Sequence, residues 1–277
     1  ATLTPHPGLK SPTFQRDNLI AARGLYDIHA YHEHGSFPAY VRLLDEQFLP
    51  MRAAAKVTAP WYANETAIHS LGGTERNQAL TLFKKLIFAW ARGAVGYNWY
   101  NLRNDGFDPM NAEHNYGMMS FDFQPKPVYS VFNMLAGTFR EARFLRPLET
   151  GDDFPAFVFA DGKNLLIPAW NESGSGSTLS VALRTDAAAA SVIDLMGNEV
   201  PQETEQGVAL LSLTPMPATL KLKGASRVEP AGRLLEAAAS GAAAPGRSFR
   251  VICRLFNPFD REREFRLKLE NLPEEFR

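Results

Sequence analysis

The sequence has 277 residues, of which 45% are hydrophobic and 21% charged, and its formal net charge at pH 7 is −1. This length allows a large core and more than one domain, and the near-zero charge provides no field that would attract nucleic acid or an anionic membrane. No apolar run approaches the roughly 20 residues needed to span a bilayer. The single cysteine, Cys253, excludes an intramolecular disulfide, and its apolar run RVICRLF predicts a small buried side chain.

The first half of the chain alternates three strand-like segments with three helical patterns. The strands are expected at 25–31, 57–63 and 94–99, and the helices at 38–56, 74–92 and 127–143. Ser36 and Thr74 are the expected N-caps of the first two helices. Such alternation predicts parallel strands with right-handed crossovers. Three units are too few to close a barrel of eight, so residues 1–148 are expected to be a late part of a (β/α)8 barrel, containing its strands six to eight.

The second half has a different pattern. Short strands with turn signals such as Asp161-Gly162 predict an antiparallel β-sandwich over residues 149–226. Residues 227–246 are rich in Ala, Gly and Pro and are expected to form a linker. Residues 247–277 are expected to begin a further β domain that is truncated after two strands. The predicted fold class is therefore α/β plus all-β.

Chemistry-bearing residues follow each strand of the first half. The stretch KVTAPWYANETAIHS predicts a buried strand with Glu65 at its C-terminal end. The C-terminal ends of the strands are where α/β barrels build their active sites. Trp61 and Tyr62 offer aromatic surfaces of the kind on which sugar rings stack. The competing interpretation is a solvated glutamate at a strand end, and the flanking segments weigh against it.

Three motifs carry a family resemblance across about residues 20–145. The strand DIHAY ends in His29-Ala30-Tyr31, the next strand ends in Glu65, and the third, GYNWY, contains Trp99. In this order the motifs resemble retaining glycoside hydrolases of the large (β/α)8 clan that includes β-xylosidases, cellulases and β-galactosidases. The resemblance implies that Glu65 is the nucleophile on strand seven and that Trp99 lies under the sugar. It also implies an acid/base glutamate on the fourth strand, which is expected upstream of this chain.

Retaining glycosidases use two carboxyl groups about 5–5.5 Å apart, one of which attacks the anomeric carbon. We therefore predict a catalytic group of Glu65, with Tyr31 as its orienting partner and His29 in the surrounding shell. Tyr31 and His29 share one strand face through their period-two spacing, although ordinary core roles for both remain an alternative. Trp99, Trp61 and Asn101 are the predicted substrate contacts, and Glu33 is a further candidate acid.

The predicted function is a retaining glycosidase acting on β-linked oligo- or polysaccharide. It needs no metal or organic cofactor, its partner is the carbohydrate substrate, and it is expected to be secreted or periplasmic. Two alternatives stay open. The chain could only bind carbohydrate without cleaving it. It could also be a metal-dependent hydrolase, because His32 and His34 form a His-x-His pair at a strand end, with His69 as the nearby extra ligand.

Overall fold

The computed structural model describes residues 13–174, 178–240 and 250–264 of the chain. These residues form two compact units, divided between Arg146 and Pro147, with the short segment Asp194–Asn198 grouped with the first unit. The first unit combines helices with a parallel sheet, and the second is built from antiparallel sheets.

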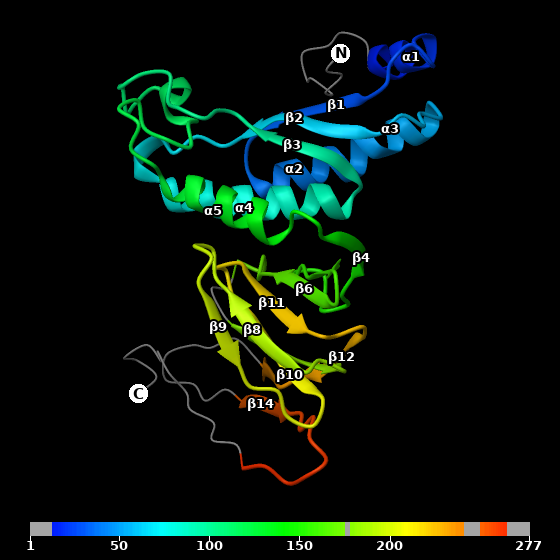
Figure 1. Cartoon of the computed structure of the whole chain (residues 1–277), viewed down its shortest axis with the longest axis vertical. Coiled ribbons are helices and arrows are strands. Elements are labelled where there is room, and N and C mark those ends of the chain that lie inside the picture. Colours follow the sequence, from blue (N-terminus) through cyan, green and yellow to red (C-terminus); the bar gives the residue numbers. More distant parts are fainter. Residues whose placement is uncertain (1–12, 175–177, 241–249, 265–277) are drawn as a thin grey trace. The chain divides into compact units, whose positions relative to one another are not determined.

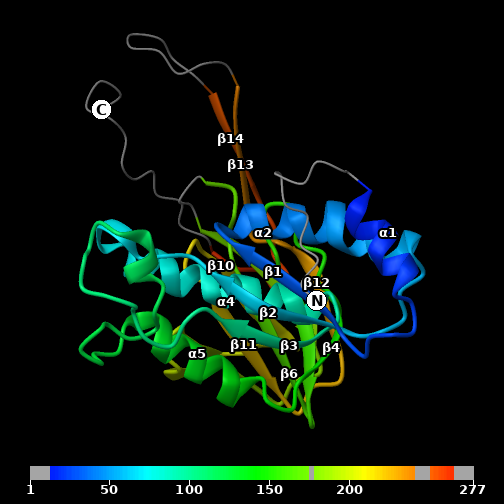
Figure 2. The ribbon, with the colours of Figure 1, turned by 90° about the horizontal axis from the view of Figure 1, so that it is seen from above.

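The sheet of the first unit consists of three parallel strands in sequential order. These are β1 (His29–His34), β2 (Trp61–Ala67) and β3 (Ala94–Trp99). Strand β2 pairs in parallel with both neighbours, and Figure 2 shows the three strands side by side. The prediction of three consecutive parallel strands is confirmed, but the first two begin four residues later than the predicted ranges 25–31 and 57–63. Their C-terminal ends therefore meet at one edge, where residues from different strands can form a common site.

Five α-helices lie among the described residues of this unit, and Figure 1 shows α2, α4 and α5 on one side of the sheet. They are α1 (Phe14–Ala21), α2 (Phe37–Leu43), α3 (Leu49–Ala54), α4 (Glu75–Ala91) and α5 (Pro127–Thr138). Short helical turns occur at Leu44–Phe48 (a π turn), Leu71–Gly73 and Ala112–Asn115. None of the described helices combines the length and the apolar character that a membrane crossing requires.

Local chemistry explains where α2 begins and why the helix widens before α3, and it shows that the predicted cap of α4 is wrong. The Ser36 hydroxyl accepts the Ala39 N–H at 3.4 Å and caps α2 as predicted. Pro50 cannot donate a backbone hydrogen bond, and the turn before it widens into the π turn that joins α2 to α3. The Thr74 hydroxyl does not cap α4 and donates instead to the Leu71 carbonyl at 3.1 Å.

Among the described residues, the second unit contains three antiparallel sheets, and the two larger ones share one apolar core. One of these two has the order β4-β5-β6-β11-β8-β9, and the division between the two units falls within its strand β4; the other has the order β10-β7-β12. The strands are β4 (Arg143–Pro147), β5 (Phe157–Asp161), β6 (Asn164–Ala169), β7 (Leu179–Thr185), β8 (Ala189–Ile193), β9 (Glu199–Gln202), β10 (Val208–Leu213), β11 (Ala218–Lys223) and β12 (Val228–Arg233). Buried residues of both sheets, including Ile167 and Leu183, form the core, as expected of a sandwich.

The segment predicted as a linker, 227–246, instead contains strands β12 and β13 (Leu235–Ser240) among its described residues. Pro230 and Gly232 suggested a linker, but among the described strands β12 pairs only with β7, and its register shifts between these two residues. An edge strand with a bulge tolerates both residue types, which is why the composition misled.

A separate two-stranded sheet pairs β13 with β14 (Arg250–Leu255). Cys253 on β14 is exposed, and so is the adjacent Ile252, although successive side chains of a strand point to opposite faces. The prediction that Cys253 is buried is therefore wrong, because its apolar run lies in a sheet with exposed side chains on both faces. The second strand expected after it lies outside the described residues.

Candidate active site

Strand β1 presents two chemically different faces. His29, Tyr31 and Glu33 alternate with Ala30, His32 and His34, and the first set is buried while the second is partly exposed. The buried set packs among core residues such as Phe48 and Tyr40. We refer to the second set as the open face of β1, because its side chains have access to solvent.

A bulge in β2 decides which of these faces Glu65 meets. Tyr31 pairs with Ala63, but the next residue, His32, pairs with Glu65, so Asn64 is an extra residue in β2. One extra residue shifts every later side chain to the other face of a strand. Glu65 would share the buried face of Trp61 and Ala63 in a regular strand, and the bulge turns it to the open face.

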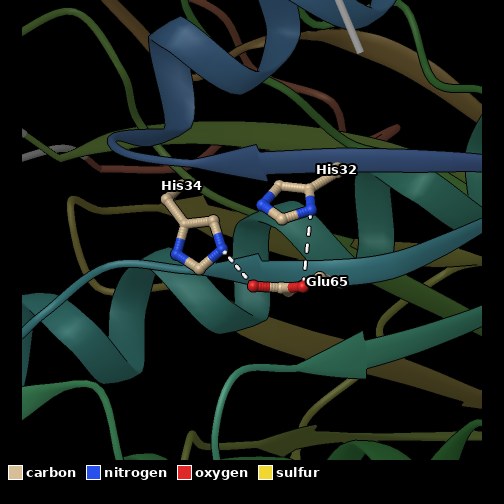
Figure 3. A group of neighbouring side chains, drawn as sticks. All are labelled: His32, His34 and Glu65. Carbon is tan, nitrogen blue, oxygen red and sulfur yellow. Dashed lines mark hydrogen bonds and ion pairs between the residues drawn. The ribbon is translucent and has the colours of Figure 1, made fainter. Parts of the chain in front are cut away.

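On the open face, both oxygens of the Glu65 carboxylate face a histidine ring. His32 Nδ1 lies 3.4 Å from Oε2, and His34 Nε2 lies 3.2 Å from Oε1. Figure 3 shows the two rings reaching from β1 toward the carboxylate on β2. About a third of the Glu65 side chain (36%) is exposed. The carboxylate is therefore held between two imidazoles and remains accessible to a ligand.

Two tyrosine rings lie beside the His34 ring. Tyr116 stands perpendicular to the His34 ring at 5.2 Å, and Tyr100 lies 5.5 Å from it. Glu65 and Trp99 both line a cavity of about 490 Å³. Trp99 is fixed there by its Nε1, which donates to the Tyr116 carbonyl at 3.2 Å. A carboxylate beside apolar and aromatic walls is an arrangement suited to holding a small polar ligand.

Electrostatics differ between the two faces of β1. On the open face, burial and then the neighbouring His32 lower the pKa of His34 below its ordinary value. On the buried face, the Glu33 carboxylate receives a hydrogen bond from Lys85 at 2.8 Å. Burial lowers the pKa of Lys85 to about 8, although the charge of Glu33 opposes that change. This buried pair ties the end of β1 to α4, directly behind the open face.

Two of the predicted catalytic residues lie on the wrong face to act on Glu65. The Tyr31 hydroxyl is fully buried and donates to the Tyr40 carbonyl at 3.3 Å. His29 is 2% exposed, and its Nδ1 lies 3.0 Å from an Arg52 nitrogen. The prediction that Tyr31 orients Glu65, with His29 nearby, is therefore wrong in position, because the bulge moves Glu65 to the face of His32 and His34.

The other predicted residues divide between cavity, core and loop. Trp99 lines the cavity with Glu65, although only 7% of the residue is exposed. Trp61 is 4% exposed, its Nε1 donates to the Arg92 carbonyl at 3.1 Å, and it is absent from the described residues that line this cavity, so it belongs to the core. Asn101 donates to Asp105 at 3.0 Å and is absent from the described residues that line the cavity. The buried Glu33 is unsuited to the role of a solvent-facing acid.

The sequence had singled out His32 and His34 only as candidate metal ligands. Their period-two spacing correctly indicated a shared face, but nothing in the sequence indicated that Glu65 joins them. His69, the predicted extra ligand, lies outside the group of His32, His34 and Glu65 in the described chain. Tyr100 and Tyr116 were missed, because loop residues carry no periodicity that would reveal their position.

Comparison with known proteins identifies the fold. No protein-family model matches the chain, and no curated protein matches it. Among solved structures, it is similar to a family 39 glycoside hydrolase from the gut symbiont Bacteroides cellulosilyticus WH2, with a TM-score of 0.60 and 23% identity. That match covers 75% of this chain and 47% of the other.

A second similar structure is a GH30 endoxylanase from Clostridium papyrosolvens C71, with a TM-score of 0.50 and 12% identity over 77% of this chain and 51% of the other. The chain thus spans about half the length of the structures it matches. Both matches are glycoside hydrolases, and the chain has a glycoside hydrolase fold at low sequence identity.

Proposed function

We propose that this chain belongs to a retaining glycoside hydrolase that acts on β-linked oligo- or polysaccharide, with Glu65 as the nucleophile. One observation carries the proposal. The Glu65 carboxylate is held at both oxygens by His32 and His34, and it lines the same cavity as Trp99. A nucleophile has to be kept still and accessible, and an aromatic wall offers an apolar surface to a sugar ring.

In this mechanism Glu65 attacks the anomeric carbon and forms a glycosyl ester, which water then cleaves. The imidazoles of His32 and His34 position the carboxylate, and Trp99 supports the sugar. The retaining scheme also needs a second carboxyl group to protonate the leaving oxygen. In this mechanism the acid/base carboxyl group belongs to a residue upstream of this sequence, on the fourth strand of a barrel.

The test uses a panel of 2,4-dinitrophenyl 2-deoxy-2-fluoro-β-glycosides derived from xylose, glucose and galactose. Dinitrophenolate is a weak base and leaves without protonation, so the reagent tests the nucleophile independently of any acid/base. We expect one reagent to add a single fluoroglycosyl group to the chain, and peptide mass spectrometry to locate it on Glu65.

One test variant and one control variant accompany the labelling experiment. Glu65→Gln keeps the side-chain shape but removes the anionic nucleophile, so labelling should be abolished while carbohydrate binding survives. Glu113→Gln changes an exposed loop carboxyl group and should label like the wild type. An adduct on another carboxylate would overturn the assignment. Binding of a xylo-, gluco- or galacto-oligosaccharide without any adduct would favour the non-catalytic carbohydrate-binding alternative.

A further inference from the structure

Three potential metal-binding side chains converge on the open face of the sheet. His32, His34 and Glu65 each offer one ligand atom, and these atoms all lie within 4.8 Å of one another. The histidines come from alternate positions of one strand, and the glutamate comes from the neighbouring strand. Since both strands belong to one paired sheet, the backbone already holds the three donors together.

The spacing of these donors suits a metal ion. Metal–nitrogen and metal–oxygen bonds of about 2.0–2.2 Å place adjacent ligands of a tetrahedral site about 3.3–3.6 Å apart. The two imidazole-to-carboxylate distances in this group are 3.4 and 3.2 Å, and they end on different oxygens of Glu65. One ligand atom from each of the three residues lies within 4.8 Å of the other two, so an ion would draw the three side chains somewhat closer together.

The ligand types narrow the class of ion. Two imidazoles and one carboxylate form a donor set that proteins use for zinc and for other divalent first-row transition metals. Calcium and magnesium instead prefer sets made of oxygen ligands. The Glu65 side chain is 36% exposed, and those of His32 and His34 are 34% and 22% exposed. This exposure provides an entry path and leaves room for water as a further ligand.

The rings are also supported from behind and from the side. Tyr116 packs at right angles to the His34 ring, and the two histidine rings lie 4.9 Å apart. Behind the strand, Glu33 is held by Lys85, which also donates to the Ala67 carbonyl at 3.0 Å at the end of β2. The ends of both ligand-bearing strands are therefore tied to one residue of α4, which limits how far the donors can separate.

We propose that His32, His34 and Glu65 form a binding site for a divalent first-row transition metal, represented by Zn²⁺. Bound metal occupies the carboxylate oxygens that would otherwise attack a sugar. The consequence, which rests on the proposed function, is that Zn²⁺ inhibits the glycosidase reaction by competing for its nucleophile. The binding itself does not depend on that function.

Binding is tested by calorimetric titration of the full metal-free chain with ZnCl₂, and with CoCl₂ as a coloured probe. We expect one equivalent of Zn²⁺ to bind. His32→Gln and His34→Gln should each weaken the affinity by about 10-fold or more, equivalent to at least 1.4 kcal/mol. His114→Gln, a histidine change on the loop, is the matched control and should bind like the wild type. Absence of one-equivalent binding, or unchanged affinity in both site variants, would overturn the proposal.

A measurement on the wild type guards against variants that fail to fold. In long-range ¹H–¹⁵N NMR spectra of the imidazoles, Zn²⁺ should shift the His32 and His34 ring nitrogens and leave those of His114 unchanged. Shifts confined to other histidines would place the metal elsewhere and overturn the site.

Fluoroglycoside labelling with and without Zn²⁺ tests the metal site and the proposed function separately. If Zn²⁺ binds at these residues and slows fluoroglycoside labelling of Glu65, both proposals are supported. If the metal binds there but no reagent labels Glu65, the site stands and the nucleophile assignment fails. If Glu65 is labelled and Zn²⁺ neither binds nor slows labelling, the glycosidase assignment stands and the metal site is wrong.

Discussion

Strand β1 carries ionisable side chains on both of its faces, and the two faces put them to different uses. On the buried face, His29 and Glu33 are 2% and 5% exposed; His29 Nδ1 lies 3.0 Å from an Arg52 nitrogen, and Glu33 accepts a hydrogen bond from Lys85. On the open face, His32 and His34 remain accessible to solvent, and both lie beside the Glu65 carboxylate. Burial links the protonation of the first pair of groups to the stability of the fold, whereas the open groups are accessible to a ligand.

The largest expected effect comes from breaking the buried pair. Lys85→Met removes the cation and leaves the Glu33 carboxylate buried without its partner, which should lower the free energy of unfolding by about 3–5 kcal/mol. Chemical denaturation measures this loss. Lys84→Met, the adjacent and less buried lysine of α4, is the control and should cost less than about 1 kcal/mol. Equal losses of unfolding free energy in the two variants would mean that the Lys85–Glu33 pair makes no particular contribution to stability.

The next effect concerns the pH dependence of His29. Burial, together with the charge of Arg52, lowers the pKa of His29 to about 4 from 6.5. As the pH falls below 6.5, the unfolded chain takes up this proton before the folded chain does. The free energy of unfolding should therefore fall by about 3 kcal/mol between pH 6.5 and pH 4.

Denaturation of the wild type and of His29→Gln across this range checks the prediction. The glutamine has no proton to take up, so the variant should lose most of this slope, whereas His114→Gln should retain it. A slope that is the same in all three proteins would show that His29 titrates alike in the folded and unfolded states.

A smaller effect is expected on the open face. His34→Gln removes an imidazole from the accessible Glu65 carboxylate, so it should change the unfolding free energy by less than about 1 kcal/mol. The rate of fluoroglycoside labelling should fall by about tenfold, which corresponds to the loss of roughly one hydrogen bond to a charged group. If His34→Gln instead destabilised the fold strongly and left labelling of the folded protein unchanged, the division between the faces would be contradicted.

The smallest effect should come from Tyr31→Phe. Its hydroxyl makes a 3.3 Å hydrogen bond to the Tyr40 carbonyl inside the core, so its removal should cost about 1 kcal/mol or less. Because this hydroxyl does not reach the open face, labelling of Glu65 should stay within about twofold of the wild-type rate. A large loss of labelling at full stability would instead support the sequence-based hypothesis that Tyr31 orients the nucleophile.

The sequence by itself determined the order and kind of the elements. Hydrophobic periodicity and turn residues predicted three strand–helix units and then a set of short antiparallel strands, and β1 to β3 and the two larger sheets of the second unit have these arrangements. It also pointed to Glu65 at a strand end and to the shared face of His32 and His34. These are local properties, because a strand's alternation and a helix's apolar stripe are visible within one segment.

Only the tertiary structure decided which face of β1 meets Glu65. Both faces carry a histidine, and the HAYHEH pattern alone does not say which face packs on helices. The answer depends on the extra residue Asn64, which appears only when β2 is paired with β1. Likewise, Lys85 and Glu33 are 52 positions apart in sequence. A register shift and a long-range ion pair arise from contacts between segments, so neither leaves a signal within one segment.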